Sequence, residues 1–178
     1  MPNERGPEEE KMMETERPYF VFVIESQMFA LAVEAVDMVT RAAALTVLPE
    51  CPKLLLGLLN LHGKRVPVVD LRSHFGLKSR GLRADDCIII CRAGRFSLGL
   101  AADDVVGVRR FTAADVDASD AIFPGMEEYI SGVGAVDGET VLIYDTGTLF
   151  SRPGFQAVKS RMEELDEETG SSRISDNG

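Results

Sequence analysis

Gly57, Gly63 and Lys64 are the residue types that a phosphate-binding loop would use. In a P-loop four residues separate the two glycines, and a serine or threonine after the lysine ligates magnesium. Here five residues separate the glycines, and Arg65 follows the lysine. The apolar run after Arg65 is typical of a strand, so no helix N-terminus would face a phosphate. We therefore interpret Gly63 as part of a tight turn.

Two pairs of adjacent aspartates, Asp85-Asp86 and Asp103-Asp104, are the candidates for general acid–base catalysis. A catalytic dyad requires two carboxyl groups that face each other. Adjacent residues of a strand point to opposite faces of the sheet, so neither pair is suited to sharing a proton. We interpret these aspartates as cap and turn residues.

Thiol or zinc chemistry would have to use the three cysteines and two histidines of the chain. The cysteines, Cys51, Cys87 and Cys91, include no CxxC, and only His62 and His74 are available as further soft ligands. We interpret Cys87 and Cys91 as buried small apolar residues, and an odd, unclustered set of cysteines favours a reducing compartment. The sequence therefore predicts a protein that is not an enzyme, with no catalytic residue, no metal and no cofactor.

Composition narrows the class of partner. The net charge is −10 and no cluster of basic residues is visible, which argues against binding to nucleic acid. No segment approaches the run of about 20 apolar residues that a transmembrane helix needs. The N-terminus is polar and then acidic, unlike a signal peptide. We expect a cytoplasmic protein with no direct membrane insertion.

Short segments rich in β-branched and aromatic residues, separated by turn residues, dominate the chain from about residue 18 to 154. Long amphipathic helices between these segments are missing, which argues against a parallel α/β fold. The pattern predicts a mainly all-β barrel or sandwich. The predicted strands are Tyr19–Ile24, Met28–Val33, Leu56–Leu61, Val66–Leu71, Cys87–Cys91, Phe96–Ala101, Ile130–Val136 and Thr140–Tyr144.

The two ends of the chain are poor in residues that could form a core. We assign residues 1–17 to a disordered acidic tail, 18–158 to the folded domain, and 159–178 to the end of a helix and a second disordered acidic tail. Apolar residues at positions 155, 158, 162 and 165 predict that helix. Its basic residues come early and its acidic residues late, against the macrodipole, so we expect it to be stable only if it packs on the body.

The body is an internal duplication. With an offset of 67, residues 20–39 match residues 87–106, and with an offset of 75, residues 57–75 match residues 132–150. The larger offset implies eight extra residues in the second copy, which we place in the polar stretch 112–128. We expect each copy to have four or five strands and to close as a small barrel.

Each copy contains two predicted hairpins and one predicted helix cap. The first hairpin turns at Ser26-Gln27 in one copy and at Ala93-Gly94 in the other, and the second turns at His62-Gly63 and Asp137-Gly138. Glycine permits the positive φ that such tight turns require. After the last strand, Asp70 and Asp145 are predicted to cap a short helical turn.

The run from Gly57 to Arg72, Gly-Leu-Leu-Asn-Leu-His-Gly-Lys-Arg-Val-Pro-Val-Val-Asp-Leu-Arg, closely resembles the signature of CheW-like domains. Flanking segments, from Phe29 to Val36 and from Tyr129 to Gly134, match the same family in the same order, and the resemblance spans about residues 18–151. It implies two tandem SH3-like five-stranded β-barrel subdomains packed together, with short helices and a C-terminal helix.

The resemblance also implies a function. Members of the family are non-catalytic adaptors that couple methyl-accepting chemoreceptors, at their cytoplasmic tip, to the regulatory domain of a CheA-type histidine kinase. The chain has no room for a kinase core or a receiver, so a stand-alone coupling protein is implied, recruited to membrane receptor arrays in which self-association is a further expectation. By resemblance the kinase-binding residues are Leu45, Pro52, Leu55, Leu56 and Gly57, and the receptor-binding residues are Val36, Met38, His62, Gly99 and Val105.

Two of these positions depart from the family pattern. His62 stands where the family usually has arginine, and Met38 stands where an acidic residue is frequent. Lys64 and Arg65 supply positive charge nearby. Two interpretations of His62 stay open, a receptor contact whose partner differs from the usual one and a tolerated turn residue. The alternatives for the whole chain are a regulatory module of a non-flagellar chemosensory pathway, or a barrel that binds a small ligand or is an enzyme.

Overall fold

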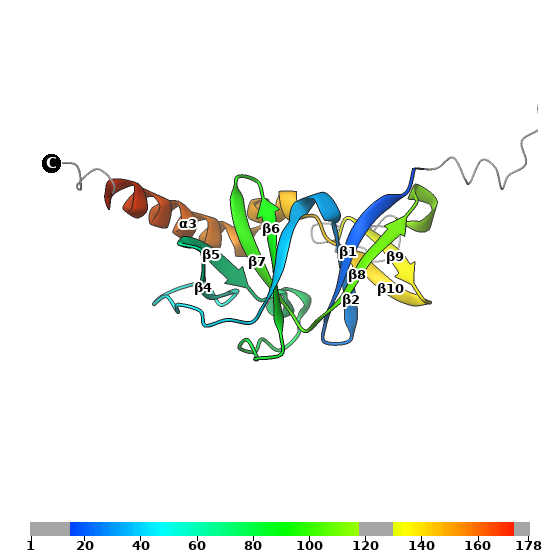
Figure 1. Cartoon of the computed structure of the whole chain (residues 1–178), viewed down its shortest axis with the longest axis horizontal. Helices are drawn as coiled ribbons and strands as arrows, with labels where there is room; N and C mark the ends of the chain where they lie inside the picture. Colours follow the sequence, from blue (N-terminus) through cyan, green and yellow to red (C-terminus); the bar gives the residue numbers. More distant parts are fainter. Residues whose placement is uncertain (1–14, 118–129, 173–178) are drawn as a thin grey trace, which may run out of the picture. The chain divides into compact units, whose positions relative to one another are not determined.

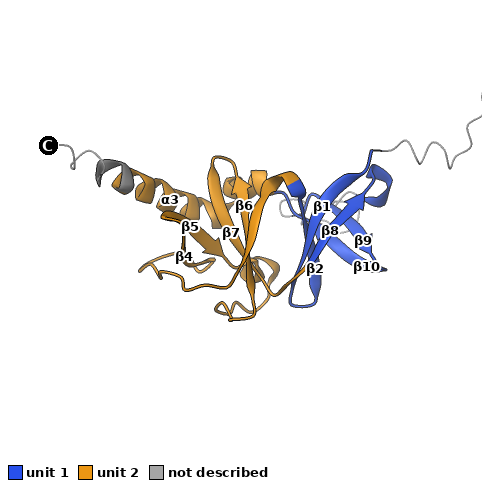
Figure 2. Cartoon of the chain, viewed as in Figure 1, with its two compact units in different colours: residues 1–33, 106–145 blue, residues 34–105, 146–178 orange. Residues whose placement is uncertain are grey.

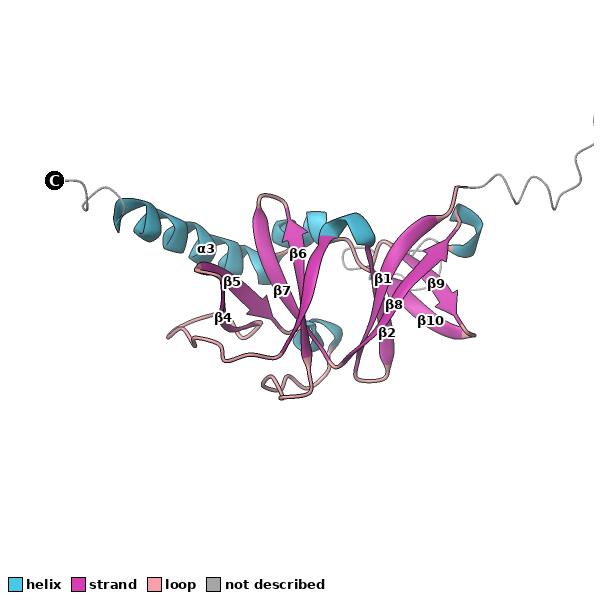
Figure 3. Ribbon diagram, viewed as in Figure 1, coloured by secondary structure: helices cyan, strands magenta, loops and turns pink. Residues whose placement is uncertain are grey.

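The computed structural model describes residues 15–117 and 130–172, whose strands form two five-stranded sheets (Figure 1, Figure 3). Most of the stretch in which the extra residues were expected lies outside the described residues, as does nearly all of the expected N-terminal tail. The described strands are β1 (Arg17–Ile24), β2 (Gln27–Ala32), β3 (Val36–Arg41), β4 (Leu55–Leu61), β5 (Lys64–Val69), β6 (Cys87–Ala93), β7 (Phe96–Ala102), β8 (Asp104–Phe111), β9 (Gly132–Val136) and β10 (Glu139–Ile143).

Each sheet combines strands from both sequence copies (Figure 2). Unit 1, residues 1–33 and 106–145, contains the order β8-β1-β2-β10-β9, and unit 2, residues 34–105 and 146–178, contains the order β3-β6-β7-β5-β4. The first hairpin of one copy therefore pairs with the second hairpin of the other. The expectation that each copy closes its own barrel is wrong in this respect.

Two parallel strand pairings join the first hairpin of one copy to the second hairpin of the other. Ile143 of β10 pairs with Ala30 of β2 in unit 1, and Val68 of β5 pairs with Gly99 of β7 in unit 2. A tight turn cannot join parallel strands, so parallel neighbours come from segments that are distant in the chain. The predicted pairing within each hairpin is retained, and only the assignment of hairpins to barrels changes.

The second hairpin of each copy turns where the sequence predicts. His62 and Gly63 have φ values of 52° and 85°, and Asp137 and Gly138 have 51° and 81°. Two consecutive positive φ values are typical of the type I′ turn that suits the twist of a hairpin. His62 is exposed at this turn.

The first hairpins turn one residue away from the predicted positions. The loops are Glu25-Ser26 and Gly94-Arg95, and Glu25 and Gly94 have φ values of 57° and 63°. Gln27 and Ala93 instead pair across their hairpins, with Ile24 and Phe96. Gly94 occupies the first loop position because its positive φ is needed there.

A single bridge between the ends of the sheet closes the barrel in unit 2. The backbone N–H groups of Thr46 and Leu58 each donate to the other residue's carbonyl oxygen at 2.9 Å. Beside this bridge Gly57 has a φ of 153°, and a Cβ atom there would lie 2.8 Å from the carbonyl oxygen of Thr46. Glycine at position 57 is thus required by the closure of the barrel.

Unit 1 repeats this arrangement at the matching glycine. Asp117 and Val133 exchange backbone hydrogen bonds of 2.8 and 2.9 Å. A Cβ atom on the neighbouring Gly132 would lie 2.6 Å from Cγ1 of Val116. Gly57 and Gly132, which the duplication matches at an offset of 75, therefore both make room for the bridge that closes their barrel.

Each barrel has its own hydrophobic core. In unit 1 all five strands contribute buried residues to the core, whereas in unit 2 the core is aliphatic and comes from β4, β5, β6 and β7. The cluster in unit 1 consists of Val21, Ala30, Phe111, Val136, Val141 and Ile143, and the cluster in unit 2 consists of Leu59, Val66, Val68, Ile88, Ile90 and Ala101.

The C-terminal helix α3 (Pro153–Ser172) packs on unit 2 through the residues that its spacing predicts. Phe155, Val158 and Met162 are buried and Leu165 is half-buried. This packing offsets the unfavourable order of charges along the helix, and α3 continues to Ser172. No helix among the described residues combines the length and the apolar composition that crossing a membrane requires.

Candidate functional site

The cysteines of β6 are packing residues. The thiol of Cys91 donates to the carbonyl oxygen of Leu98 at 3.4 Å, and burial, together with the charge of Asp37, raises its pKa to about 12. Burial likewise raises the pKa of Cys87. Protonated thiols are poor nucleophiles and poor metal ligands. Across residues 15–117 and 130–172 there is no group of three or more His, Cys, Asp or Glu side chains that could hold a metal ion.

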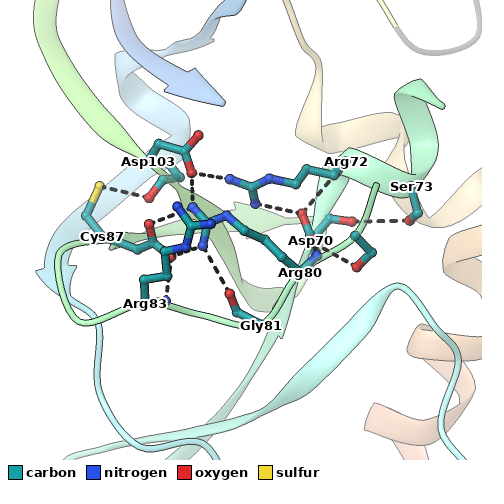
Figure 4. A network of polar contacts seen from close by, with 11 residues as sticks. Asp70, Arg72, Ser73, Arg80, Gly81, Arg83, Cys87 and Asp103 are labelled. Atoms are coloured by element: carbon teal, nitrogen blue, oxygen red, sulfur yellow. Dashed lines mark hydrogen bonds and ion pairs between the residues drawn. The ribbon is translucent and has the colours of Figure 1, made fainter. Parts of the chain in front are cut away.

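A buried network of charged side chains begins at Asp70, at the end of β5 (Figure 4). Asp70 caps the 3₁₀ helix η2 (Leu71–Phe75), as predicted, by accepting from the backbone N–H of Arg72 at 3.1 Å. The same carboxylate also accepts from the Arg72 guanidinium at 3.0 Å and from the Ser79 hydroxyl at 2.9 Å. Asp70 and Arg72 are 0% and 1% exposed, so both charges depend on these partners.

Arg80 connects the network to Asp86, just before β6, and to Asp103, between β7 and β8 (Figure 4). It binds the carboxylate of Asp86 through two hydrogen bonds, of 2.7 and 2.9 Å. Arg72 and Arg80 both donate to Asp103. The network fastens the loop between η2 and β6 to the barrel. The charged groups of the network bind one another. It is a structural cluster and offers no open site for chemistry.

The network also explains the two aspartate pairs. Asp86 and Asp103 belong to it, whereas their neighbours Asp85 and Asp104 are exposed. Asp104 accepts from the backbone N–H of Val105 at 2.8 Å, which is a local turn contact. Within each pair the two carboxylates therefore have separate surroundings and do not form a dyad.

Asp86 is expected to make the stability of unit 2 sensitive to acid. Hydrogen bonds from the Arg80 guanidinium, and from the backbone N–H of Arg83, hold the pKa of Asp86 below its ordinary value against the opposing effect of burial. A lowered pKa in the folded state means that the stabilisation is complete above the unfolded-state pKa of about 3.9 and is lost as the pH falls through the folded-state pKa. Urea denaturation at several pH values should show this acid-induced loss, and Asp86→Asn should reduce it. An equal pH dependence in both proteins would contradict the assignment.

The structure brings the residues predicted to bind the kinase together in unit 2. The backbone N–H of Leu55 donates to the carbonyl oxygen of Pro52 at 2.9 Å, and a Cβ atom on Gly57 would lie 3.0 Å from Cβ of Leu45. Leu55 and Gly57 are buried, whereas Leu45, Pro52 and Leu56 are half-buried.

The most exposed large apolar residue of this region is one that the sequence analysis missed. Val47 is 74% exposed, in the segment between β3 and β4. The signal in the sequence was a short, mostly apolar run, residues 45–48, outside any predicted strand. We call the exposed and half-buried apolar residues Leu45, Val47, Leu48, Pro52 and Leu56 the loop patch.

The residues predicted to bind the receptor are more dispersed. Val36 pairs with Cys91 in the part of β6 near its turn, and Lys64 Nζ donates to Ser97 Oγ at 2.7 Å, so Val36 and the turn at His62 lie toward the same end of the sheet. Val105 follows the far end of β7.

Met38 and Gly99 are the other two residues predicted to bind the receptor. Met38 is 40% exposed on the edge strand β3, beside Val39, which is 38% exposed and was not predicted. Gly99 is buried within β7, where a Cβ atom would lie 2.9 Å from Cγ2 of Ile88. A partner could therefore reach Met38 and Val39 through their side chains but not the position of Gly99.

Two small barrels with a structural ion network, and with apolar side chains exposed on a loop and an edge strand, define a protein-binding domain. Comparison with known families agrees with this class. The family model described as CheW-like domain matches residues 18–154. The chain belongs to the CheW-like domain family.

Individual relatives cover nearly the whole domain. A probable chemotaxis protein CheW of Rhizobium etli is 26% identical over 144 residues, which are 80% of this chain and 93% of that protein. The chemotaxis protein CheW of Thermotoga maritima is 27% identical over 124 residues, 70% of this chain and 81% of that protein. The crystal structure of the scaffolding protein TtCheW from Thermoanaerobacter tengcongensis superposes with a TM-score of 0.70 at 26% identity, covering 79% of this chain and 96% of that one. The match confirms the two SH3-like barrels.

Proposed function

We propose that this protein is a non-catalytic chemosensory adaptor, which couples methyl-accepting chemoreceptors to a CheA-type histidine kinase. The observation that carries the proposal is the CheW-like domain over residues 18–154. Relatives named as chemotaxis and scaffolding proteins support it. We place its action in the cytoplasm, at receptor arrays.

An adaptor of this kind works through differences in affinity. It can transmit a change in the receptor to the kinase only if it binds the two states of its partner with different free energies. Two separate surfaces are needed for simultaneous binding. Unit 2 offers two candidate surfaces, the loop patch and the exposed side chains of Met38 and Val39 on β3.

We assign the kinase contact to the loop patch and the receptor contact to β3 and the turn at His62. Exposed apolar residues that gather on one surface mark sites of protein–protein interaction. Leu55 and Gly57 contribute through the shape of the loop, since their side-chain positions are buried. The departures at Met38 and His62 favour a dedicated receptor, as in a pathway that serves something other than flagellar motility.

Val47→Ser is expected to weaken binding to the regulatory domain of the cognate kinase at least tenfold, or about 1.4 kcal/mol. Val47 is 74% exposed, so the substitution removes an apolar contact without disturbing the core. Isothermal titration calorimetry with that domain measures the effect. Val39→Ser, at a residue 38% exposed on β3, is the matched control and should leave kinase binding unchanged. Equal losses in the two variants would refute the assignment of the kinase contact to the loop patch.

A further inference from the structure

A groove in unit 2 lies between the β4–β5 hairpin and helix α3. It encloses about 470 Å³, and α3 runs alongside this hairpin in Figure 1. Leu58 and Pro67 from the hairpin, with Met162 and Leu165 from α3, give it apolar walls. The residues of the turn, from His62 to Arg65, form one rim, and Asp166 of α3 lies on the other.

The turn concentrates positive charge on an otherwise acidic chain. Arg65 is exposed and has no hydrogen-bond or ion-pair partner among the described residues, and Lys64 is bonded to the neutral hydroxyl of Ser97. Asp166, across the groove, is not joined to either cation by an ion pair. The groove is therefore open, and its two cations are available to an external carboxylate.

Helix α3 is what turns the hairpin surface into a groove. The match to the family model ends at residue 154, and α3 begins at Pro153. Met162 and Leu165 come from the middle of this helix, beyond the matched residues. This part of the apolar wall therefore lies outside the segment that the family model matches.

We propose that this groove binds an acidic amphipathic helical segment of a partner protein. Charge decides between candidate segments, since Lys64 and Arg65 favour carboxylates and repel basic residues. The apolar walls require apolar anchors on the same segment, and a helix presents such anchors at i, i+3 or i+4 on one face, with charged residues beside them. The inference rests on the proposed function, which assigns the turn at His62 to the receptor contact. It adds that the segment bound beside this turn is acidic and amphipathic.

The test uses defined peptides, so that it does not depend on the receptor. The probe is a fluorescein-labelled helical peptide with leucines at i, i+3 and i+7 and glutamates on both flanks, and its counterpart carries lysine in place of each glutamate. Fluorescence anisotropy with the full chain should show binding of the acidic peptide, at least tenfold weaker binding of the basic one, and weakening by salt. Lys64→Glu/Arg65→Glu should reduce the affinity for the acidic peptide at least tenfold.

Matched variants separate the groove from general electrostatics. Lys78→Glu/Arg83→Glu makes the same change in charge at exposed side chains outside the groove and should leave the affinity unchanged. Leu165→Ala shortens the apolar wall at a half-buried position and should weaken binding without loss of the folded state, as checked by circular dichroism. Equal losses in the two charge-reversal variants, or no binding of the acidic peptide at about 1 mM, would overturn the proposal.

A second copy of the chain is the competing occupant, because the exposed half of α3 is itself acidic. Sedimentation equilibrium decides this point. A dimer that Lys64→Glu/Arg65→Glu dissociates would replace the proposed partner by self-association. Failure of the peptide test together with normal receptor binding would refute the groove inference alone and leave the adaptor function intact.

Discussion

Asp70→Ala is expected to lower the free energy of unfolding of unit 2 by about 3–5 kcal/mol, because it breaks a buried ion pair by removing one partner. Arg72 is 1% exposed, its guanidinium loses the 3.0 Å contact to Asp70, and η2 loses its cap at the same time. Urea denaturation followed by circular dichroism measures the change.

Asp85→Ala is the control for this prediction. Asp85 is exposed, and its side chain makes no hydrogen bond or ion pair among the described residues. Its replacement removes the same charge close to the network and should change stability by no more than about 0.5 kcal/mol. If the two alanine variants were equally stable, the network would not hold the loop as described.

Gly57→Ala is expected to destabilise unit 2 by about 2–4 kcal/mol, from backbone strain and from overlap with the bridge that closes the barrel. The φ of 153° and the 2.8 Å approach to the carbonyl oxygen of Thr46 are the two causes. Thermal denaturation measures the loss, and kinase affinity should be compared only at temperatures where the variant is folded.

Gly63→Ala separates the two causes. Gly63 has a φ of 85°, but a Cβ atom there would have no neighbour within 4 Å. Its cost should be limited to backbone strain, about 1–2 kcal/mol. A cost for Gly57→Ala no larger than that of Gly63→Ala would show that the close approach to Thr46 is unimportant.

Local features of the fold were predictable because they depend on neighbouring residues. Both second-hairpin turns, the Asp70 cap and the buried face of α3 follow from short patterns. Strands β3 and β8 were missed because β3 buries none of its residues and β8 buries only Phe111, and both carry charged residues, so they lack the apolar alternation of a core strand. The pairing of hairpins between copies was not predictable, since each hairpin fits either barrel locally.

The candidate surfaces, too, were predictable only in those features that do not depend on the folded chain. A family resemblance placed the loop at Leu45 and Pro52 next to Gly57, and the structure brings these residues together. The exposure of Val47 depends on which side of the loop faces the core, and no short pattern encodes that. The ion network joins aspartates and arginines from segments up to residue 103, so its assembly required the folded chain.

The exchange of hairpins also sets the order in which the barrels can be completed while the ribosome makes the chain. The strands of the sheet in unit 2 all lie between residues 36 and 102, so this sheet can form once that stretch has left the exit tunnel. The hairpin of β1 and β2 is made earlier, yet its neighbours β8 and β10 end at residues 111 and 143. Until they emerge, both edges of that hairpin are open, and an open edge is a template for pairing with other chains. The β1–β2 hairpin is therefore made before the strands of unit 2, but it belongs to the sheet that is completed later.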